Sequence, residues 1–216
     1  MKDRTIVVFA PHPDDELLGC GGVIAKRKKQ GYKVVICIAT NGKNEVRFEE
    51  EKKSCEYLQI DHIEFLNFPD LHLDSVPKEK LTKKLLEVID KYKPEEVYMP
   101  HRFDLHTDHR VLSEALLVAI RPKYKNTPTY AYTYETMSET GWNFQESSNS
   151  FNPNVYEDIT EEIEQKKTAL KMHESQVYQY PSSRSVEAVE ALAVYRGVQA
   201  EMKYAEAFCL VRCYKR

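Results

Sequence analysis

The chain contains 216 residues, of which 42% are hydrophobic, and this apolar content is enough to close one substantial core. Disordered, collagenous and coiled-coil proteins are therefore excluded. The 31 Lys and Arg residues against 34 Asp and Glu residues leave a net charge of −3. This balance argues against nucleic acid or an anionic membrane as a partner.

The first half of the chain alternates short runs rich in Val and Ile with longer segments whose apolar residues recur every three or four positions. This alternation predicts strands at 6–10, 34–39, 63–66 and 96–99, and helices at 17–30, 47–58, 78–92 and 108–120. The strands at 6–10 and 34–39 are apolar without interruption, which indicates burial on both faces. We therefore predict an α/β fold, a Rossmann-like three-layer sandwich with a mostly parallel central sheet.

The pattern changes after Pro122. Strands are expected at 129–133 and 207–211, and helices at 160–172 and 185–202. Ser138 to Pro153 is polar and without periodicity, which predicts a mobile loop. Ten of the 14 tyrosines follow residue 120. Strand packing is the favoured explanation, and an aromatic sugar-binding surface is the alternative.

We expect one domain over residues 1–216, in which 1–122 form the Rossmann-like core and 123–216 supply a substrate-loop region and the closing helices and strand. The apolar run before Pro11 is too short for a secretory signal or a membrane span, so we expect a cytoplasmic protein. The cysteines are odd in number and include no C-x-x-C pair, which predicts reduced, buried thiols. They are Cys20, Cys37, Cys55, Cys209 and Cys213.

Two polar motifs follow two of the predicted strands. Pro11-His-Pro-Asp-Asp-Glu16 comes after the first strand, and His101-Arg-Phe-Asp-Leu-His-Thr-Asp-His109 comes after the fourth. Doubly wound sheets commonly have the strand order 3-2-1-4, with ligands bound above the carboxyl ends of neighbouring strands. Right-handed crossovers would then bring both motifs into one cleft at the strand ends, where we expect the active site.

The residues that meet there are histidines and aspartates, a ligand set suited to zinc, with iron or manganese as alternatives. A catalytic site needs three protein ligands, a position for water, and a separate carboxylate that takes the proton of that water. Asp14 and Asp15 can divide these roles, although the residues alone do not say which does which.

Each motif also has a simpler interpretation. Asp14, Asp15 and Glu16 could cap a helix, because acidic side chains satisfy free backbone N–H groups there. The histidines His101, His106 and His109 could individually be surface or core residues. The coincidence of both motifs at neighbouring strand ends favours a metal site.

Three glycines, Gly19, Gly21 and Gly22, suggest a dinucleotide-binding turn, but Ile24 stands where the third glycine of G-x-G-x-x-G is required. The glycines also follow the acidic run, which would repel a pyrophosphate. We interpret them as permitting close packing of a helix on a strand.

The sequence resembles the PIG-L/LmbE-like family of zinc-dependent N-deacetylases, which act on N-acetylglucosaminyl compounds. The resemblance rests on the first motif and on His106-Thr-Asp-His109, and it extends over nearly the whole chain. Weaker matches are Arg47-x-x-Glu50, Pro69-Asp-Leu71, His173-x-Ser-Gln176 and Ala205-Glu-Ala-Phe208.

The resemblance implies that His12, Asp15 and His109 bind zinc, with Fe²⁺ as an alternative metal. It also implies roles for residues that do not bind the ion. These are Asp14 as general base, His106 as electrophile, Asp108 as the residue that orients His106, and Arg47 as a substrate contact. Either His106 or the protonated Asp14 would be the proton donor to the amine. For His173, a helix-end position and a supporting role behind the site both remain open.

We therefore expect zinc-dependent hydrolysis of the N-acetyl amide of a small amino-sugar substrate, giving acetate and a free amine. The alternatives are a metal-dependent phosphoesterase that uses the same cleft and a non-catalytic metal-containing binding module. The phosphoesterase predicts a second metal and a cationic phosphate clamp. The sequence leaves the aglycone and the homo-oligomeric state open.

Overall fold

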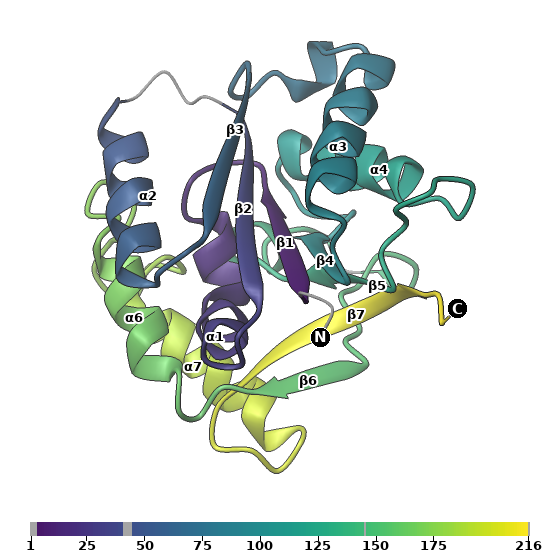
Figure 1. Ribbon diagram of the computed structural model, residues 1–216. Helices are drawn as coiled ribbons and strands as arrows, with labels where there is room; N and C mark the ends of the chain where they lie inside the picture. The colour runs from purple at the N-terminus through teal and green to yellow at the C-terminus, as the bar shows by residue number, and fades with distance from the viewer. Residues whose placement is uncertain (1–3, 41–44, 145, 216) are drawn as a thin grey trace.

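The computed structural model describes residues 4–40, 45–144 and 146–215. Its centre is a seven-stranded sheet with the order β3-β2-β1-β4-β5-β7-β6 (Figure 1). The strands are β1 Thr5–Ala10, β2 Lys33–Thr40, β3 His62–Phe68, β4 Glu96–Pro100, β5 Tyr130–Tyr134, β6 Val155–Asp158 and β7 Ala205–Cys213. The first five strands pair in parallel, and β7 pairs antiparallel with both β5 and β6. The predicted mostly parallel α/β sheet is therefore confirmed.

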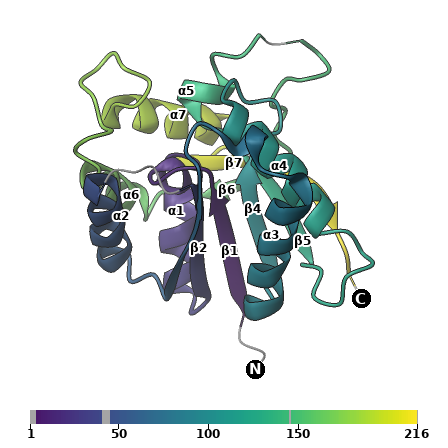
Figure 2. The same ribbon diagram turned by 90° about the horizontal axis from the view of Figure 1, so that it is seen from above.

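Helices cover both faces of this sheet (Figure 2). They are α1 Asp15–Lys29, α2 Glu45–Tyr57, α3 Lys78–Tyr92, α4 Thr107–Ala119, α5 Met137–Thr140, α6 Ile163–Lys171 and α7 Val186–Val198, with a 3₁₀ turn, η1, at Leu73–Ser75. α1, α2 and α6 lie on one side, and α3 and α4 lie on the other. The expected three layers are present.

The apolar strand β1 shows why the sequence folds in this way. Its side chains alternate between the faces of the sheet. Ile6 and Val8 belong to the core under α1, whereas Val7 and Phe9 belong to the core under α3 and α4. All four are fully buried. Because helices cover both faces of the sheet, the run from Ile6 to Phe9 has to be apolar throughout.

The glycines of α1 allow close packing, as expected. A Cβ atom at Gly19 would lie 2.2 Å from the ring of Tyr134 on β5, and one at Gly22 would lie 2.6 Å from Ile159. The hydroxyl of Tyr134 donates a hydrogen bond to the carbonyl of Phe9, at 3.0 Å. These contacts fix the start of α1 against the ends of β1 and β5.

The structure differs from the sequence prediction in the second half. The edge strand β6 was not predicted, because its four residues include two acids and no apolar run. The helix α5 lies inside the predicted loop at 138–153, with Ser138 and Thr140 buried. The mobility of that loop and the single-domain organisation stay predictions.

The cysteine prediction is correct in part. All five thiols are free, and Cys20, Cys37 and Cys55 are buried. Cys209 is half-buried and Cys213 is exposed, because β7 runs out of the core at its end. Among the helices that the structure describes, none is long and apolar enough to cross a membrane.

Candidate metal centre and active site

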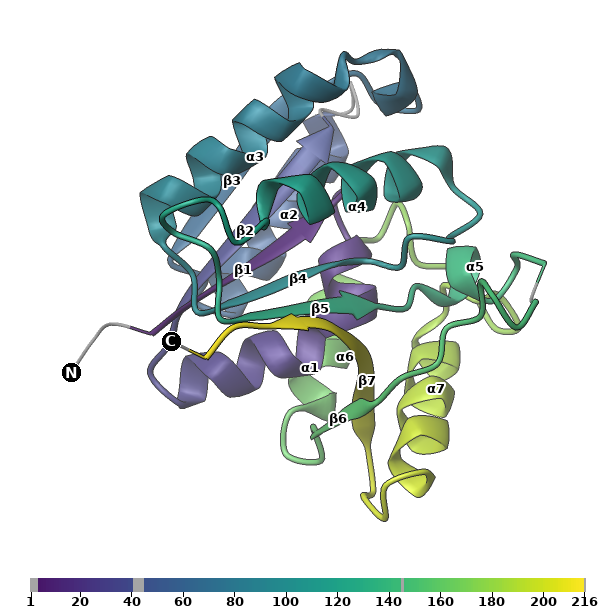
Figure 3. The same cartoon turned by 90° about the vertical axis from the view of Figure 1, so that its right-hand side faces the viewer.

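The strand order places the two polar motifs side by side. β1 and β4 are parallel neighbours, with Val7 opposite Val97, so their carboxyl ends lie at one edge of the sheet (Figure 3). The turn after β1 carries His12, and Asp15 begins α1. The segment after β4 leads into α4, whose first turn carries His109. The two motifs therefore meet, as the predicted strand order required.

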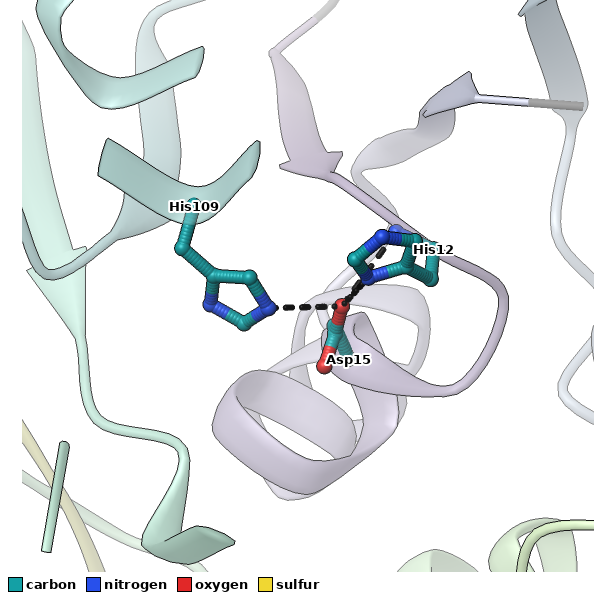
Figure 4. A group of neighbouring side chains, drawn as sticks. All are labelled: His12, Asp15 and His109. Atoms are coloured by element: carbon teal, nitrogen blue, oxygen red, sulfur yellow. Dashed lines mark hydrogen bonds and ion pairs between the residues drawn. The ribbon is translucent and has the colours of Figure 1, made fainter. Parts of the chain in front are cut away.

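His12, Asp15 and His109 converge on one point (Figure 4). Nδ1 of His12 lies 3.0 Å from Oδ2 of Asp15, and Nε2 of His109 lies 3.2 Å from the same oxygen. The imidazole and carboxylate donor atoms of the three residues all lie within 4.8 Å of one another, and all three side chains are buried.

On the imidazoles of His12 and His109, the nitrogen that does not face Asp15 contacts another carboxylate. Nδ1 of His109 lies 2.9 Å from Oδ2 of Asp104. Nε2 of His12 lies 3.2 Å from Oδ2 of Asp108 and 3.2 Å from Oδ1 of Asp70. Such partners fix the ring orientation and the tautomer of metal-binding histidines, so that the second nitrogen of each ring is free for an ion. Two imidazole nitrogens and one carboxylate oxygen suit zinc, and the donor set therefore fits the metal.

The backbone conformation of Asp14 directs its carboxylate away from that of Asp15. Its backbone lies in the left-handed region, with φ of 97°, and its side chain makes no capping bond to α1. Oδ2 is paired with the guanidinium of Arg184, and Oδ1 lies 3.8 Å from Nη2 of Arg47. The helix-cap interpretation thus fails for the Asp14 carboxylate. A strained backbone at this position instead directs the carboxylate into the pocket.

Oδ1 of Asp14 is buried and has no hydrogen-bond partner among the described residues. Burial raises the pKa of this carboxyl to about 6, although the charges of Arg184 and Arg47 oppose the shift. The backbone N–H of Asp14 donates to Oε2 of Glu16, at 3.1 Å, which holds the strained peptide in place. An oxygen with free lone pairs is therefore available as a proton acceptor.

His106 stands at the N-terminus of α4. Its Nδ1 accepts a hydrogen bond from the backbone N–H of Asp108, at 3.1 Å, so the neutral ring carries its proton on Nε2. The ring centroid lies 4.7 Å from that of His12. Burial and the nearby charges of His12 and His109 lower the pKa of His106. The side chain is thus a neutral hydrogen-bond donor beside the metal ligands.

The position of Asp108 differs from the expectation that it orients His106. Its carboxylate contacts His12 and accepts the backbone N–H groups of Leu71, at 2.9 Å, and Leu73, at 3.0 Å. The hydrogen bond between Asp108 and His106 comes from the backbone N–H of Asp108. Leu71 precedes η1 and Leu73 begins it, so the Asp108 carboxylate ties this segment to His12.

Arg47 reaches the site from α2. Its Nη2 donates to the carbonyl of Pro13, at 3.0 Å, and its Nε is buried without a hydrogen-bond partner among the described residues. A buried N–H donor that faces a pocket is a candidate contact for a substrate oxygen. Its position agrees with the expected substrate contact.

The site opens into a pocket of about 130 Å³. It is lined by His12, Asp14, Asp15, Arg47, Asp70, Leu71, His106, His109, Glu139, Gln176 and Arg184. Arg184 and Glu139 were missed from the sequence, because they lie on segments without a motif. Asp104 was also missed, although it lies five residues before the predicted ligand His109 and could have been found from that spacing.

His101 and His173 lie outside this pocket. Nε2 of His101 lies 3.1 Å from the carbonyl oxygen of Asn149, so this histidine holds the loop after α5. Nε2 of His173 lies 3.0 Å from Oγ of Ser54 on α2, and its ring is fully buried. Burial lowers the pKa of His173 to about 4. Burial therefore favours the neutral ring over a charged role at the end of α6, and the supporting role behind the site stays a prediction.

Known proteins are similar to this chain in sequence and in fold. The family model described as PIG-L, GlcNAc-PI de-N-acetylase, matches residues 7–120. The chain is 29% identical over 229 residues to the diacetylchitobiose deacetylase of Thermococcus kodakarensis, in an alignment that covers 96% of this chain and 83% of the relative. It is 30% identical over 185 residues to the uncharacterized deacetylase YaiS of Escherichia coli, covering 81% of this chain and 92% of the relative.

A solved structure supports the same fold. The conserved protein TT1542 from Thermus thermophilus superposes with a TM-score of 0.79 at 27% sequence identity. The superposition covers 100% of this chain and 97% of that one.

Proposed function

This chain belongs to the PIG-L (GlcNAc-PI de-N-acetylase) family, and on that premise we propose that it hydrolyses the N-acetyl amide of an N-acetylglucosamine-type sugar or conjugate. The relative in Thermococcus kodakarensis is a diacetylchitobiose deacetylase, which supports this substrate class. One observation carries the proposal. Three buried metal-binding side chains and a separate carboxylate with a free oxygen face the same pocket.

His12, Asp15 and His109 would hold a zinc ion, with Fe²⁺ as the alternative. When bound, such an ion supplies Lewis acidity, which polarises an amide carbonyl and lowers the pKa of water. Asp104 and Asp108 keep the two imidazoles in the orientation that binding requires.

Asp14 acts as the general base. Its free Oδ1 takes a proton from the water whose oxygen bonds to the amide carbon. Arg184 holds the other carboxylate oxygen and so fixes the direction of Oδ1. The proton then held by Asp14 is available for the nitrogen of the leaving group.

His106 stabilises the oxygen of the former carbonyl. Its Nε2–H group is the free donor of the ring, because Nδ1 is engaged by the backbone of Asp108. One preorganised donor at such an oxygen is typically worth about 3 to 4 kcal/mol. The C–N bond breaks when the amine is protonated by Asp14 or by His106, and acetate and a free amine result.

Arg47 contributes to substrate binding. Its unpaired Nε–H faces the pocket and can donate to a hydroxyl or carbonyl oxygen of the sugar. Gln176 and Asp70 line the same pocket and add donors and acceptors of the kind that sugar hydroxyls require.

The phosphoesterase alternative predicts a second metal. Two further donor groups exist among the described residues. His12 with His106 and Asp108 shares His12 with the first group, whereas Glu16 with Glu51 and His173 shares no residue with it. The Asp108 oxygens also accept the backbone N–H groups of Leu71 and Leu73. Elemental analysis separates the alternatives, since two ions per chain would favour the phosphoesterase.

The proposed function is tested by acetate release. Zinc-loaded protein is incubated with N-acetylglucosamine, N,N′-diacetylchitobiose and N-acetylglucosaminyl conjugates, and acetate and free amine are both quantified. We expect equal amounts of the two products from at least one compound. Absence of acetate from the whole panel would overturn the proposal.

A further inference from the structure

Two loops beside the pocket expose aromatic side chains. Trp142 is 68% exposed on the segment after α5, and Tyr178 and Tyr180 are 55% and 69% exposed on the segment before α7. We call these three residues the aromatic rim. Exposed large apolar side chains that gather near a pocket mark a binding surface more often than isolated ones do.

The loop with the two tyrosines begins and ends at the pocket. Gln176 and Arg184 line the pocket, and Arg184 is paired with Asp14. Nε of Arg184 donates to the carbonyl of Gln176, at 3.4 Å, which draws the two ends of the loop together. Tyr178 and Tyr180 lie between these ends, and the loop projects beyond the carboxyl ends of the strands (Figure 2). The tyrosines therefore lie on a loop whose two ends line the pocket.

Trp142 lies on the segment that follows the pocket residue Glu139. It follows the pocket residue Glu139 by three positions, so the two Cα atoms are at most about 11 Å apart. The carbonyl of Glu139 accepts the backbone N–H of Leu105, at 3.1 Å, and Oγ1 of Thr140 donates to Asp104, at 2.6 Å. The start of this loop is thus tied to the segment that carries His106 and His109.

The loop with Trp142 is held by hydrogen bonds of its own. Nδ2 of Asn149 donates to the carbonyl of Phe144, at 3.0 Å, and Oδ1 of Asn149 accepts the N–H of Glu146, at 2.7 Å. Nε2 of His101 also lies 3.1 Å from the carbonyl oxygen of Asn149. A surface ordered before its ligand arrives loses less entropy on binding.

The composition of both loops indicates what they bind. Residues 141–154 contain no Lys or Arg and a single acid, Glu146, and residues 175–183 contain no charged residue. An anionic lipid or nucleic acid would require basic side chains. The loops instead combine aromatic rings with Asn, Gln and Ser, which suits a neutral ligand with an apolar face and many hydroxyl groups. A pyranose ring has both.

We propose that the aromatic rim is a subsite for the second sugar of a neutral oligosaccharide whose N-acetylglucosamine end occupies the pocket. This inference rests on the proposed function and narrows its substrate class. The apolar face of the second ring stacks on Trp142 and contacts Tyr178 and Tyr180, while the catalytic residues act on the first sugar. Of the tyrosines after residue 120, Tyr130, Tyr132 and Tyr134 lie in β5, whereas Tyr178 and Tyr180 belong to this subsite.

Fluorescence tests the subsite without turnover. Trp142 is the single tryptophan of the chain, so emission excited at a wavelength that tyrosine does not absorb reports on the rim alone. The zinc-loaded Asp14→Asn variant is titrated with N,N′-diacetylchitobiose and with N-acetylglucosamine. We expect a saturable shift to shorter wavelength with the disaccharide and no shift with the monosaccharide. An unchanged spectrum with the disaccharide, or equal shifts with both sugars, overturns the proposal.

Kinetics give a second test with a matched control. Tyr195 is 54% exposed, a fraction similar to that of Tyr178, but it lies ten residues along α7 from Ser185, about 15 Å away. In wild-type background, Tyr178→Ala and Tyr180→Ala should lower kcat/KM for the disaccharide about 10-fold, through KM, and change the monosaccharide less than about twofold. Tyr195→Ala should change neither. Equal losses on both sugars, or an equal loss in Tyr195→Ala, contradict the subsite.

The two tests separate this inference from the proposed function. A saturable shift with no acetate from either sugar would retain the subsite and reject the deacetylase. Acetate from both sugars, with no change in the tryptophan spectrum, would retain the deacetylase and reject the subsite. If the tyrosine variants lose activity on an aryl N-acetylglucosaminide but not on the disaccharide, the rim binds an apolar group and the sugar subsite is rejected.

Discussion

The strand ends and the surrounding loops of this protein differ in how they hold their side chains. His12, Asp15 and His109 are at most 7% exposed, and each is fixed by neighbouring groups. Trp142 and Tyr180 are more than two thirds exposed on loops. The sheet therefore places the groups for chemistry rigidly, and the loops present groups that recognise what lies outside the pocket. Changes in the two regions should affect different quantities.

The largest effect is expected at the strand ends, for Asp14→Asn. An amide cannot accept the proton of water, so kcat for acetate release should fall by about 10² to 10⁴. The metal content should not change, since Asp14 is not among the three converging ligands. Turnover is measured by acetate release and metal by elemental analysis.

A matched change keeps this prediction specific. Glu146→Gln makes the same replacement of a carboxylate by an amide, but in the loop region. It should leave kcat for the monosaccharide within about twofold of wild type. If both variants lose activity equally, Asp14 has no special role as a base.

His173 lies in the second half of the chain, yet it is as buried as the metal ligands. It therefore tests whether a buried histidine outside the strand ends affects stability. Its pKa of about 4 lies below the usual 6.5, so the folded state favours the neutral ring. As the pH falls from 6.5 toward 4, the unfolded state takes up a proton that the folded state does not. The free energy of unfolding should therefore drop by up to about 3 kcal/mol over this range.

The contribution of His173 is isolated by His173→Gln. Chemical denaturation of both proteins between pH 7 and pH 4.5 should give a steeper loss of stability in the wild type. Parallel pH profiles would show that this ring is not a buried neutral imidazole.

A smaller effect is expected behind the metal ligands, for Asp104→Asn. The carboxylate that orients His109 becomes an amide, while the volume and the contact with Thr140 are nearly kept. Zinc affinity, measured by competition with a chelator, should fall by about 10- to 100-fold. Full affinity with lost activity would assign Asp104 to chemistry instead of metal orientation.

The smallest effect is expected for Tyr195→Ala. This exposed ring lies on α7 away from both regions, and a surface change of this kind typically alters stability by less than about 0.5 kcal/mol. Thermal unfolding and monosaccharide turnover should both match wild type. A large loss of either would mean that the outer face of α7 belongs to the functional surface.

The sequence was sufficient to predict the sheet and the meeting of the two motifs at its strand ends. Uninterrupted apolar strands such as β1 predict a buried parallel sheet, and its strand order brings His12 and His109 together. The hydrogen bonds of the Asp108 carboxylate could not be predicted, because they depend on the backbone N–H groups of Leu71 and Leu73, whose orientation the short Pro69-Asp-Leu71 match does not indicate. Arg184 was missed for a similar reason, since it reaches Asp14 from 170 positions away on an aperiodic loop.

The most direct test of the metal centre is the zinc content of the purified wild-type protein and of His109→Ala, measured by elemental analysis after loading and desalting. About one ion per chain is expected in the wild type and close to none in the variant. This result requires that the segments after β1 and β4 share a single ion. Equal zinc content in the two proteins would contradict the account, because His109 would then not be a ligand.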